Sequence, residues 1–126
     1  MIIVVQDLKD SIEEITKFIS KKWTTNILID LFEGKKRLSY ILDSNDNLSN
    51  KVLSERLKEM IKAGYVQKLV INMIPLKIKY QLSMQGYELK NILFEIARFG
   101  LLTQQNGVTE NIDPEKIKQM RKYFEL

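Results

Sequence analysis

Six polar or charged side chains lie between residues 50 and 62 at intervals of three and four, a spacing that would place them on one face of a helix. They are Asn50, Lys51, Ser54, Glu55, Lys58 and Lys62. An Asn side chain can form two hydrogen bonds with adenine, a Lys can reach the acceptors of guanine, and a Ser can contact a base or a phosphate. The face therefore has the chemistry needed to read the major groove of double-stranded DNA, although many solvated helix faces have a similar composition.

The apolar residues of the same segment predict the helix that carries this face. They recur at helical intervals and are Val52, Leu53, Leu57, Met60 and Ile61. Ser49 stands at the expected N-cap and Gly64 at the expected C-cap, so we predict a helix from Ser49 to Ala63. Glu55 is ambiguous, because it could accept from a cytosine amino group or pair with Lys51 or Lys58; we favour the salt bridge.

Two alternating segments follow this helix and predict a β-hairpin. They run from Gln67 to Asn72 and from Leu76 to Ser83, and Pro75 near the tip favours a turn. Alternation with a period of two predicts one dry face and one wet face. We assign six residues to the dry face: Leu69, Ile71, Leu76, Ile78, Tyr80 and Leu82. The wet face would be basic through Lys68, Lys77 and Lys79, which could meet phosphates or could simply block aggregation at a sheet edge.

The remaining segments supply a mainly helical frame. In chain order we expect first a helix from about Leu8 to Ser20 and a helix beginning at Trp23 and closed by Gly34. A short strand from Lys35 to Leu38 would then pair with the hairpin. A short helix starting at Ser39–Leu42 and a turn at Asp43–Asn47 would follow. Trp23 could line an effector pocket, but we expect it in the core, and we expect Tyr65 and Tyr80 to be packing residues too.

A long helix over residues 84–105 and a last helix over residues 114–125 complete the chain. The long helix has an apolar stripe of Leu89, Ile92, Leu93, Ile96 and Phe99, widened by further apolar residues. A helix that is apolar over so much of its girth needs partners on more than one side. Asp113 and Pro114 would begin the last helix, with Ile117, Met120 and Phe124 on one face. We expect these two helices and helix 8–20 to form a homodimer interface; the alternative is a monomer that folds them onto its own core.

Charge is concentrated on the segment that would contact DNA. Residues 35 to 79 contain ten basic and four acidic side chains, a net charge of +6, whereas the whole chain has a net charge of +4. Release of counterions from DNA phosphates requires such a basic surface.

Composition excludes several other classes of protein. The 126 residues fit one domain, and the absence of Cys and His excludes disulfides, thiolate metal sites and the commonest neutral-pH acid–base group. No phosphate-binding loop, nucleophile–base pair or paired carboxylates are present, so we expect neither an enzyme nor a bound cofactor or metal. The apolar segment Met1–Val5 is too short to span a membrane and lacks the features of a signal peptide, which favours a cytoplasmic protein with no membrane partner.

The order of these motifs resembles the HxlR-type branch of winged helix-turn-helix transcriptional regulators, relatives of the MarR group. The resemblance spans roughly residues 12 to 100 and rests on these segments: Lys22-Trp23, Ile27-Leu28 with Leu31, Gly34 to Leu38, Leu48 to Leu57, Gly64-Tyr65-Val66, Pro75, and Tyr80 to Gly86. The chain departs from the family pattern at Lys21 and Asn47, where glycine is usual, and at Leu76, where a second proline is frequent. Several family members sense oxidants through an N-terminal cysteine, and the absence of Cys rules out that mechanism here.

The resemblance implies a homodimeric DNA-binding regulator formed by one winged helix-turn-helix domain, mainly α with a small antiparallel hairpin. The DNA-binding unit would span about residues 22–83, with Ser49–Ala63 as the recognition helix and Gln67–Gln81 as the wing. We expect Asn50, Lys51, Ser54 and Lys58 to face bases, and Arg37, Ser39, Ser49, Arg56, Lys62, Lys68, Lys77 and Lys79 to complete the contact surface, mostly at phosphates.

A dimer would bind an inverted-repeat operator in double-stranded DNA. The alternative is a winged-helix module that binds other proteins and not specific DNA, although a basic wing and helix argue against it. An unknown small-molecule effector stays open.

Overall fold

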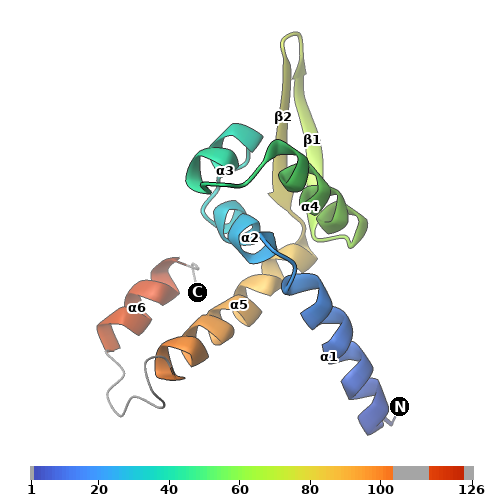
Figure 1. Ribbon diagram of the computed structural model, residues 1–126, viewed down its shortest axis with the longest axis vertical. Helices are drawn as coiled ribbons and strands as arrows, with labels where there is room; N and C mark the ends of the chain where they lie inside the picture. Colours follow the sequence, from blue (N-terminus) through green and yellow to red (C-terminus); the bar gives the residue numbers. More distant parts are fainter. Residues whose placement is uncertain (1, 104–113, 124–126) are drawn as a thin grey trace.

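A helical body with a long hairpin at one end forms the fold of the computed structural model, which describes residues 2–103 and 114–123 (Figure 1). The elements in chain order are α1 (Val5–Ile19), α2 (Thr24–Phe32), α3 (Leu38–Ser44), α4 (Asn50–Lys62), β1 (Val66–Met73), β2 (Leu76–Leu82), α5 (Met84–Thr103) and α6 (Pro114–Tyr123). The two strands form one antiparallel sheet. The architecture is the predicted one, mainly α with a single hairpin.

The core lies where α2, α3, α4 and the N-terminal half of α5 meet the base of the hairpin. Ile27, Leu28, Ile41, Leu53 and Met60 have no exposed surface. Val66 and Leu82 attach the hairpin to this core, since they pair with each other across the sheet and are both buried. The hairpin and α1 project from opposite ends of this body (Figure 1).

The connection between α3 and α4 is formed by residues suited to a tight turn. Asn47 stands where the resemblance predicts glycine and has a φ of 72°, in the left-handed region that Asn tolerates better than most residues. Helix α3 continues to Ser44, so it takes in the first residues of the predicted turn cluster. The departure at Asn47 therefore preserves the turn.

Two predicted boundaries are wrong. Helix α1 begins at Val5 and not at Leu8. Residues Lys35–Leu38 do not form a strand: α3 already begins at Leu38, and only one backbone hydrogen bond joins this segment to the hairpin, from the Tyr80 N–H to the Lys36 carbonyl at 2.7 Å.

The strand pairing also corrects the predicted faces of the hairpin. Lys68 lies opposite Tyr80, whereas Leu69 lies opposite Lys79, so directly paired residues place Lys68 on one face and Lys79 on the other. The register shifts between Val70 and Asn72, which leaves Ile71 as the extra residue of a bulge. Lysines therefore stand on both faces of the wing, and not on a single wet face.

The apolar residues of α5 lie on two faces, one buried and one exposed. Leu89, Leu93 and Phe94 are buried in the core, whereas Ile92, Ile96 and Phe99 are exposed. Helix α6 packs on its own subunit through Ile117 and Met120, and the Arg121 guanidinium lies 4.9 Å from the centroid of the Phe94 ring. The predicted roles of Asp113 and Phe124 fall outside the described residues.

One serine joins the end of α4 to the start of α5. The Ser83 hydroxyl donates to the Gly64 carbonyl and accepts from the Gly86 N–H, and the Ser83 N–H donates to the Tyr65 carbonyl. Gly64 has a φ of 85°, which a side chain would disfavour, and a Cβ atom on Gly86 would overlap the Tyr65 carbonyl oxygen. Both glycines are therefore required by the geometry of this joint.

Candidate nucleic-acid interface

Helix α4 presents the predicted polar face to solvent. The buried residues of the helix are Leu53, Leu57 and Met60. All six polar residues of the opposite face are exposed: Asn50, Lys51, Ser54, Glu55, Lys58 and Lys62. The Ser49 hydroxyl accepts from the Val52 N–H at 3.1 Å and so caps the helix, as predicted. Ser49 therefore has a structural role whether or not it also contacts DNA.

Salt bridges within the described part of the chain do not neutralise the lysines of this face. In the part of the chain that the structure describes, Lys51, Lys58 and Lys62 form no salt bridge. Glu55 forms none among the described residues either, so the predicted salt bridge with Lys51 or Lys58 is absent. An exposed Glu55 without an internal salt bridge is open to a cytosine amino group, which was the other interpretation.

Arg56 differs from its neighbours on α4 because it points to the body of the protein. Its Nε donates to the Lys22 carbonyl at 2.9 Å, and its Nη1 lies 3.2 Å from Glu59, which also binds Lys21 at 3.0 Å. The Arg56 side chain is only 18% exposed. Arg56 therefore has a structural role, in which it fastens α4 to the connection between α1 and α2.

The wing adds positive charge without any negative charge. Residues 66 to 83 contain Lys68, Lys77 and Lys79 and no Asp or Glu. Lys68 and Lys77 are exposed and Lys79 is half-buried, and none of them has a salt bridge within the described residues. All formal charges on the hairpin are therefore positive, which favours contact with phosphates.

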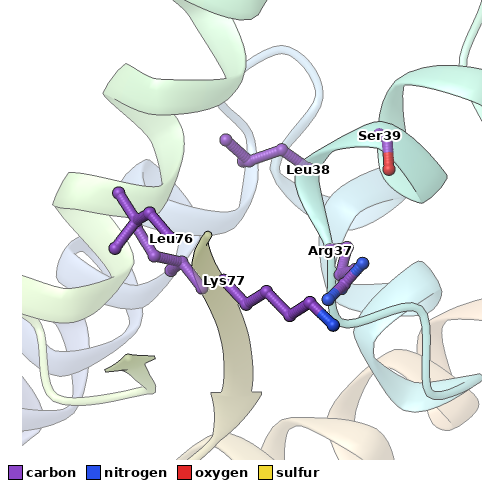
Figure 2. A pocket seen from close by; sticks show the side chains of 6 residues that line it. Arg37, Leu38, Ser39, Leu76 and Lys77 are labelled. Atoms are coloured by element: carbon purple, nitrogen blue, oxygen red, sulfur yellow. The ribbon is translucent and has the colours of Figure 1, made fainter. Parts of the chain in front are cut away.

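Arg37 and Ser39 lie beside the wing at the start of α3. With Leu38, Leu76, Lys77 and Ile78 they line an open groove of about 250 Å³ between α3 and β2. Figure 2 shows the Lys77 side chain extending from β2 toward Arg37. Two cations from different elements thus border one groove, which suits a DNA phosphate better than any neutral group.

A polar network around Asp30 holds α3 in place, and the sequence analysis did not predict it. Asp30 on α2 accepts from the Asn45 Nδ2 at 2.6 Å and from the Ser44 hydroxyl at 3.0 Å, and its other oxygen lies 3.4 Å from the Lys35 Nζ. The Asn45 amide also donates to the Ile41 carbonyl at 2.8 Å. A lone acid within the apolar run of α2 was the available signal for this network.

Three aromatic side chains pack in or against the core. Trp23 and Tyr65 pack against the core and Tyr80 is buried in it, so all three are packing residues as expected. Among the described residues no group of three or more metal-binding side chains occurs. No helix of the described chain is long and apolar enough to cross a membrane.

Known proteins resemble this chain in sequence and in fold. The family model described as HxlR-like helix-turn-helix matches residues 18–107. The HTH-type transcriptional regulator YvaP of Bacillus subtilis is 39% identical over 102 residues, which cover 81% of this chain and 87% of YvaP.

Two solved structures of transcriptional regulators superpose well on this chain. A regulator described as belonging to the MarR family, from Enterococcus faecalis V583, aligns with a TM-score of 0.71 and 30% identity over 79% of this chain and 91% of its own. YtcD, an HTH-type regulator known from Bacillus subtilis, aligns with a TM-score of 0.67 and 34% identity over 71% of this chain and 91% of its own. These similarities agree with the exposed basic face of α4 and with the basic wing. The chain belongs to the HxlR-like helix-turn-helix family and is a DNA-binding transcriptional regulator, not an enzyme.

Proposed function

We propose that the protein is a homodimer that binds an inverted-repeat operator, with α4 in the major groove and the wing on the phosphate backbone. The observation that carries this proposal is the exposed face of α4, whose lysines have no salt bridge in the described part of the chain. Asn50, Lys51, Ser54 and Lys58 read base edges in this proposal. Arg37, Ser39, Ser49, Lys62, Lys68, Lys77 and Lys79 hold the backbone, and Arg56 is excluded because its guanidinium is engaged inside the subunit.

The dimer is supported by apolar surface that one subunit leaves uncovered. Helix α1 buries none of its residues, and its Leu8 and Ile12 are exposed although α1 is strongly amphipathic. On α5, Ile92, Ile96 and Phe99 are exposed as well. A groove of about 290 Å³ between α1 and α5 is lined by residues of both helices, mostly isoleucines. A contiguous apolar surface of this kind marks an interface, and a second copy supplies the same helices as its cover.

The dimer gives a reason for an inverted repeat. Two copies related by a two-fold axis would present two α4 helices to successive major grooves, about 34 Å apart on one side of the duplex. Each half-site alone would be weak, and the pair would supply the affinity and the spacing of the operator.

Selection of bound duplexes from a random pool tests this proposal directly. We expect the recovered sequences to contain two inverted half-sites whose centres lie about one helical turn apart. A pool that stays random at every salt concentration would contradict sequence-specific binding. Early elution of the parent from immobilised duplex DNA would favour the alternative, a module that binds other proteins.

Two substitutions separate backbone contacts from base contacts. Lys79→Ala should weaken binding to all sequences similarly and flatten the slope of log K against log salt by about one unit, because one phosphate is no longer neutralised. Asn50→Ala should cost roughly 1–3 kcal/mol and relax the preference at particular base pairs. Lys118→Ala, an exposed lysine on α6, is the control and should bind as the parent does. Parent-like binding by both test variants would show that the assigned face is wrong.

A charged substitution on the exposed apolar face of α5 tests the proposed dimer interface. Ile96 is 50% exposed on α5, and Ile96→Glu should shift the sedimenting species from dimer to monomer because a carboxylate resists burial in an apolar interface. Ile96→Leu, which keeps the apolar surface, should remain dimeric. A monomeric parent would refute the dimer.

A further inference from the structure

We propose that Glu55 selects a cytosine in each half-site by accepting a hydrogen bond from the cytosine N4 amino group in the major groove. This inference rests on the proposed function, because it needs α4 to lie in that groove. It adds an acid to the proposed readers of bases, which are otherwise neutral or positively charged.

Glu55 lies in the middle of the outward face of α4. It stands two residues after Leu53 and two residues before Leu57, which are 0% and 2% exposed. Two residues correspond to about 200° around a helix, so the Glu55 side chain leaves α4 almost opposite to both buried leucines. A duplex that meets the outward face of α4 therefore meets Glu55 directly.

The two acids of α4 differ in what holds them. The Glu59 carboxylate lies 3.0 Å from the Lys21 Nζ and 3.2 Å from the Arg56 Nη1, so it belongs to the contacts that fasten α4 to the body of the protein. Glu55 is exposed and has no salt bridge to any other residue that the structure describes. The Glu55 carboxylate is therefore available to a donor on a partner molecule.

An ionised carboxylate only accepts hydrogen bonds, which limits what it can bind in a duplex. Phosphates repel it, and the major-groove edges of guanine and thymine present acceptors and a methyl group. The donors in that groove are the cytosine N4 and adenine N6 amino groups. Adenine also places its N7 acceptor beside the amino group, where it would repel the second carboxylate oxygen, whereas cytosine does not. Cytosine is therefore the base that suits Glu55 best.

Two lysines offset the cost of placing a carboxylate near phosphates. Lys51 and Lys58 are exposed on the same face, one helical turn before Glu55 and one turn after it. A rise of about 1.5 Å per residue puts them roughly 6 Å and 4.5 Å from Glu55 along the helix axis. These offsets correspond to one or two base pairs of about 3.4 Å each, and a lysine can reach the acceptors of guanine. We therefore expect guanines within about two base pairs of the selected cytosine.

The experiment uses the intact protein and a duplex that the parent recovers from the random pool. Each base pair of the half-sites is replaced in turn, and affinities are compared at one salt concentration. For the parent, replacing one C·G pair should lower affinity about tenfold or more, as expected for the loss of a hydrogen bond to a charged acceptor. N4-methylcytosine at this position should have a similar effect on the parent, because the methyl group replaces the hydrogen that faces the groove and the base pair is kept.

Substitution of Glu55 should change the preference at that base pair and not at the others. Glu55→Ala should bind the cytosine duplex and its N4-methylated form within about threefold of each other, because no acceptor is left. Glu55→Gln should prefer adenine at this position, since a Gln amide can form two hydrogen bonds with adenine N6 and N7. Asp43→Asn is the control: it removes the same charge from an exposed position on α3 and should keep the parent's preference for cytosine. All these variants replace exposed side chains, so they should fold as the parent does.

The outcomes separate this inference from the proposed function. A parent that recovers no preferred sequence from the pool would refute both. A parent whose preferred half-site tolerates N4-methylcytosine at every cytosine would refute the role of Glu55 alone. If Glu55→Ala bound all duplexes more tightly by one common factor and kept the parent's preference, the carboxylate would only repel phosphates, and the inference would equally be overturned.

Discussion

The buried carboxylate of Asp30 should determine how firmly α3 and the turn before α4 are held. Its side chain is 9% exposed and accepts three hydrogen bonds, of which the two shorter ones come from Asn45 at 2.6 Å and from Ser44 at 3.0 Å. A hydrogen bond to a charged group contributes about 1.5–3 kcal/mol. Without Asp30, the Ser44 hydroxyl can donate to the Tyr40 carbonyl instead, whereas Asn45 keeps the Ile41 carbonyl as the acceptor of only one of its two N–H groups. We therefore expect Asp30→Ala to lower the free energy of unfolding by about 2–4 kcal/mol.

The Lys35 contact adds little to this figure. Its Nζ lies 3.4 Å from Asp30 but 2.9 Å from Glu33, and the side chain is 36% exposed. Exposed ion pairs contribute about 0–1 kcal/mol. The two donors, Ser44 and Asn45, therefore account for most of the expected loss.

Urea denaturation followed by Trp23 fluorescence measures the effect, at one fixed protein concentration because the proposed dimer would unfold in a concentration-dependent way. Asn45→Ala and the double variant with Asp30→Ala complete a thermodynamic cycle, in which we expect a coupling energy of about 1–2 kcal/mol. Asp43→Ala, an exposed acid on the same helix α3, is the control and should stay within about 0.5 kcal/mol of the parent. A coupling energy below about 0.5 kcal/mol, with Asp30→Ala itself costing less than about 1 kcal/mol, would refute this account of the network.

Three further results are expected. Ser49→Ala should lose about 0.5–2 kcal/mol of stability with the α4 cap, whereas the exposed Ser54→Ala should lose none; equal losses would contradict the capping role. Gly86→Ala should destabilise by about 1–3 kcal/mol because its Cβ meets a backbone oxygen, whereas Gly100→Ala meets no atom within 4 Å and should stabilise helix α5; melting temperatures that move the same way would refute the close approach. Burial raises the pKa of Tyr80, so the folded state holds this proton more tightly than the unfolded state does. Its stabilising effect is then complete below about pH 10 and is lost as the pH rises through the folded pKa, and Tyr80→Phe should show a smaller loss in alkaline denaturation.

Helix α4 could be predicted from sequence because its determinants are local. Ser49 caps the helix, Gly64 ends it, and the apolar spacing of Leu53, Leu57 and Met60 fixes which face is buried. The exposure of the opposite face follows from that spacing alone. The family resemblance could be read for the same reason, since it rests on these local motifs in order.

The faces of the hairpin could not be predicted from alternation, because pairing across the turn decides them. The anchors are Val66 and Leu82 at the base, and counting from them places Lys79 opposite Leu69. The extra residue at Ile71 then changes the alternation toward the tip. Apolar spacing suggested a different register because the tip itself is apolar and exposed.

The fate of individual charged residues also escaped sequence reasoning. Arg56 directly follows the exposed Glu55 on α4, yet its side chain turns inward. It donates to the Lys22 carbonyl, 34 positions earlier in the chain. Asp30 is held by side chains 14 and 15 positions later. Contacts over such separations depend on tertiary packing, and no local pattern encodes them.

The joint at Ser83 couples the direction of α5 to that of α4. Three hydrogen bonds of this one residue join Gly64 and Tyr65, which directly follow α4, to the first turn of α5, and Gly86 lets the two segments approach closely. The 20 residues of α5 span about 30 Å, so a tilt of about 5° at the joint displaces its far end by roughly 2.6 Å. In the proposed dimer, a change in the angle between the two α5 helices would therefore change the orientation of both α4 helices, and with it the operator spacing that the dimer could accept.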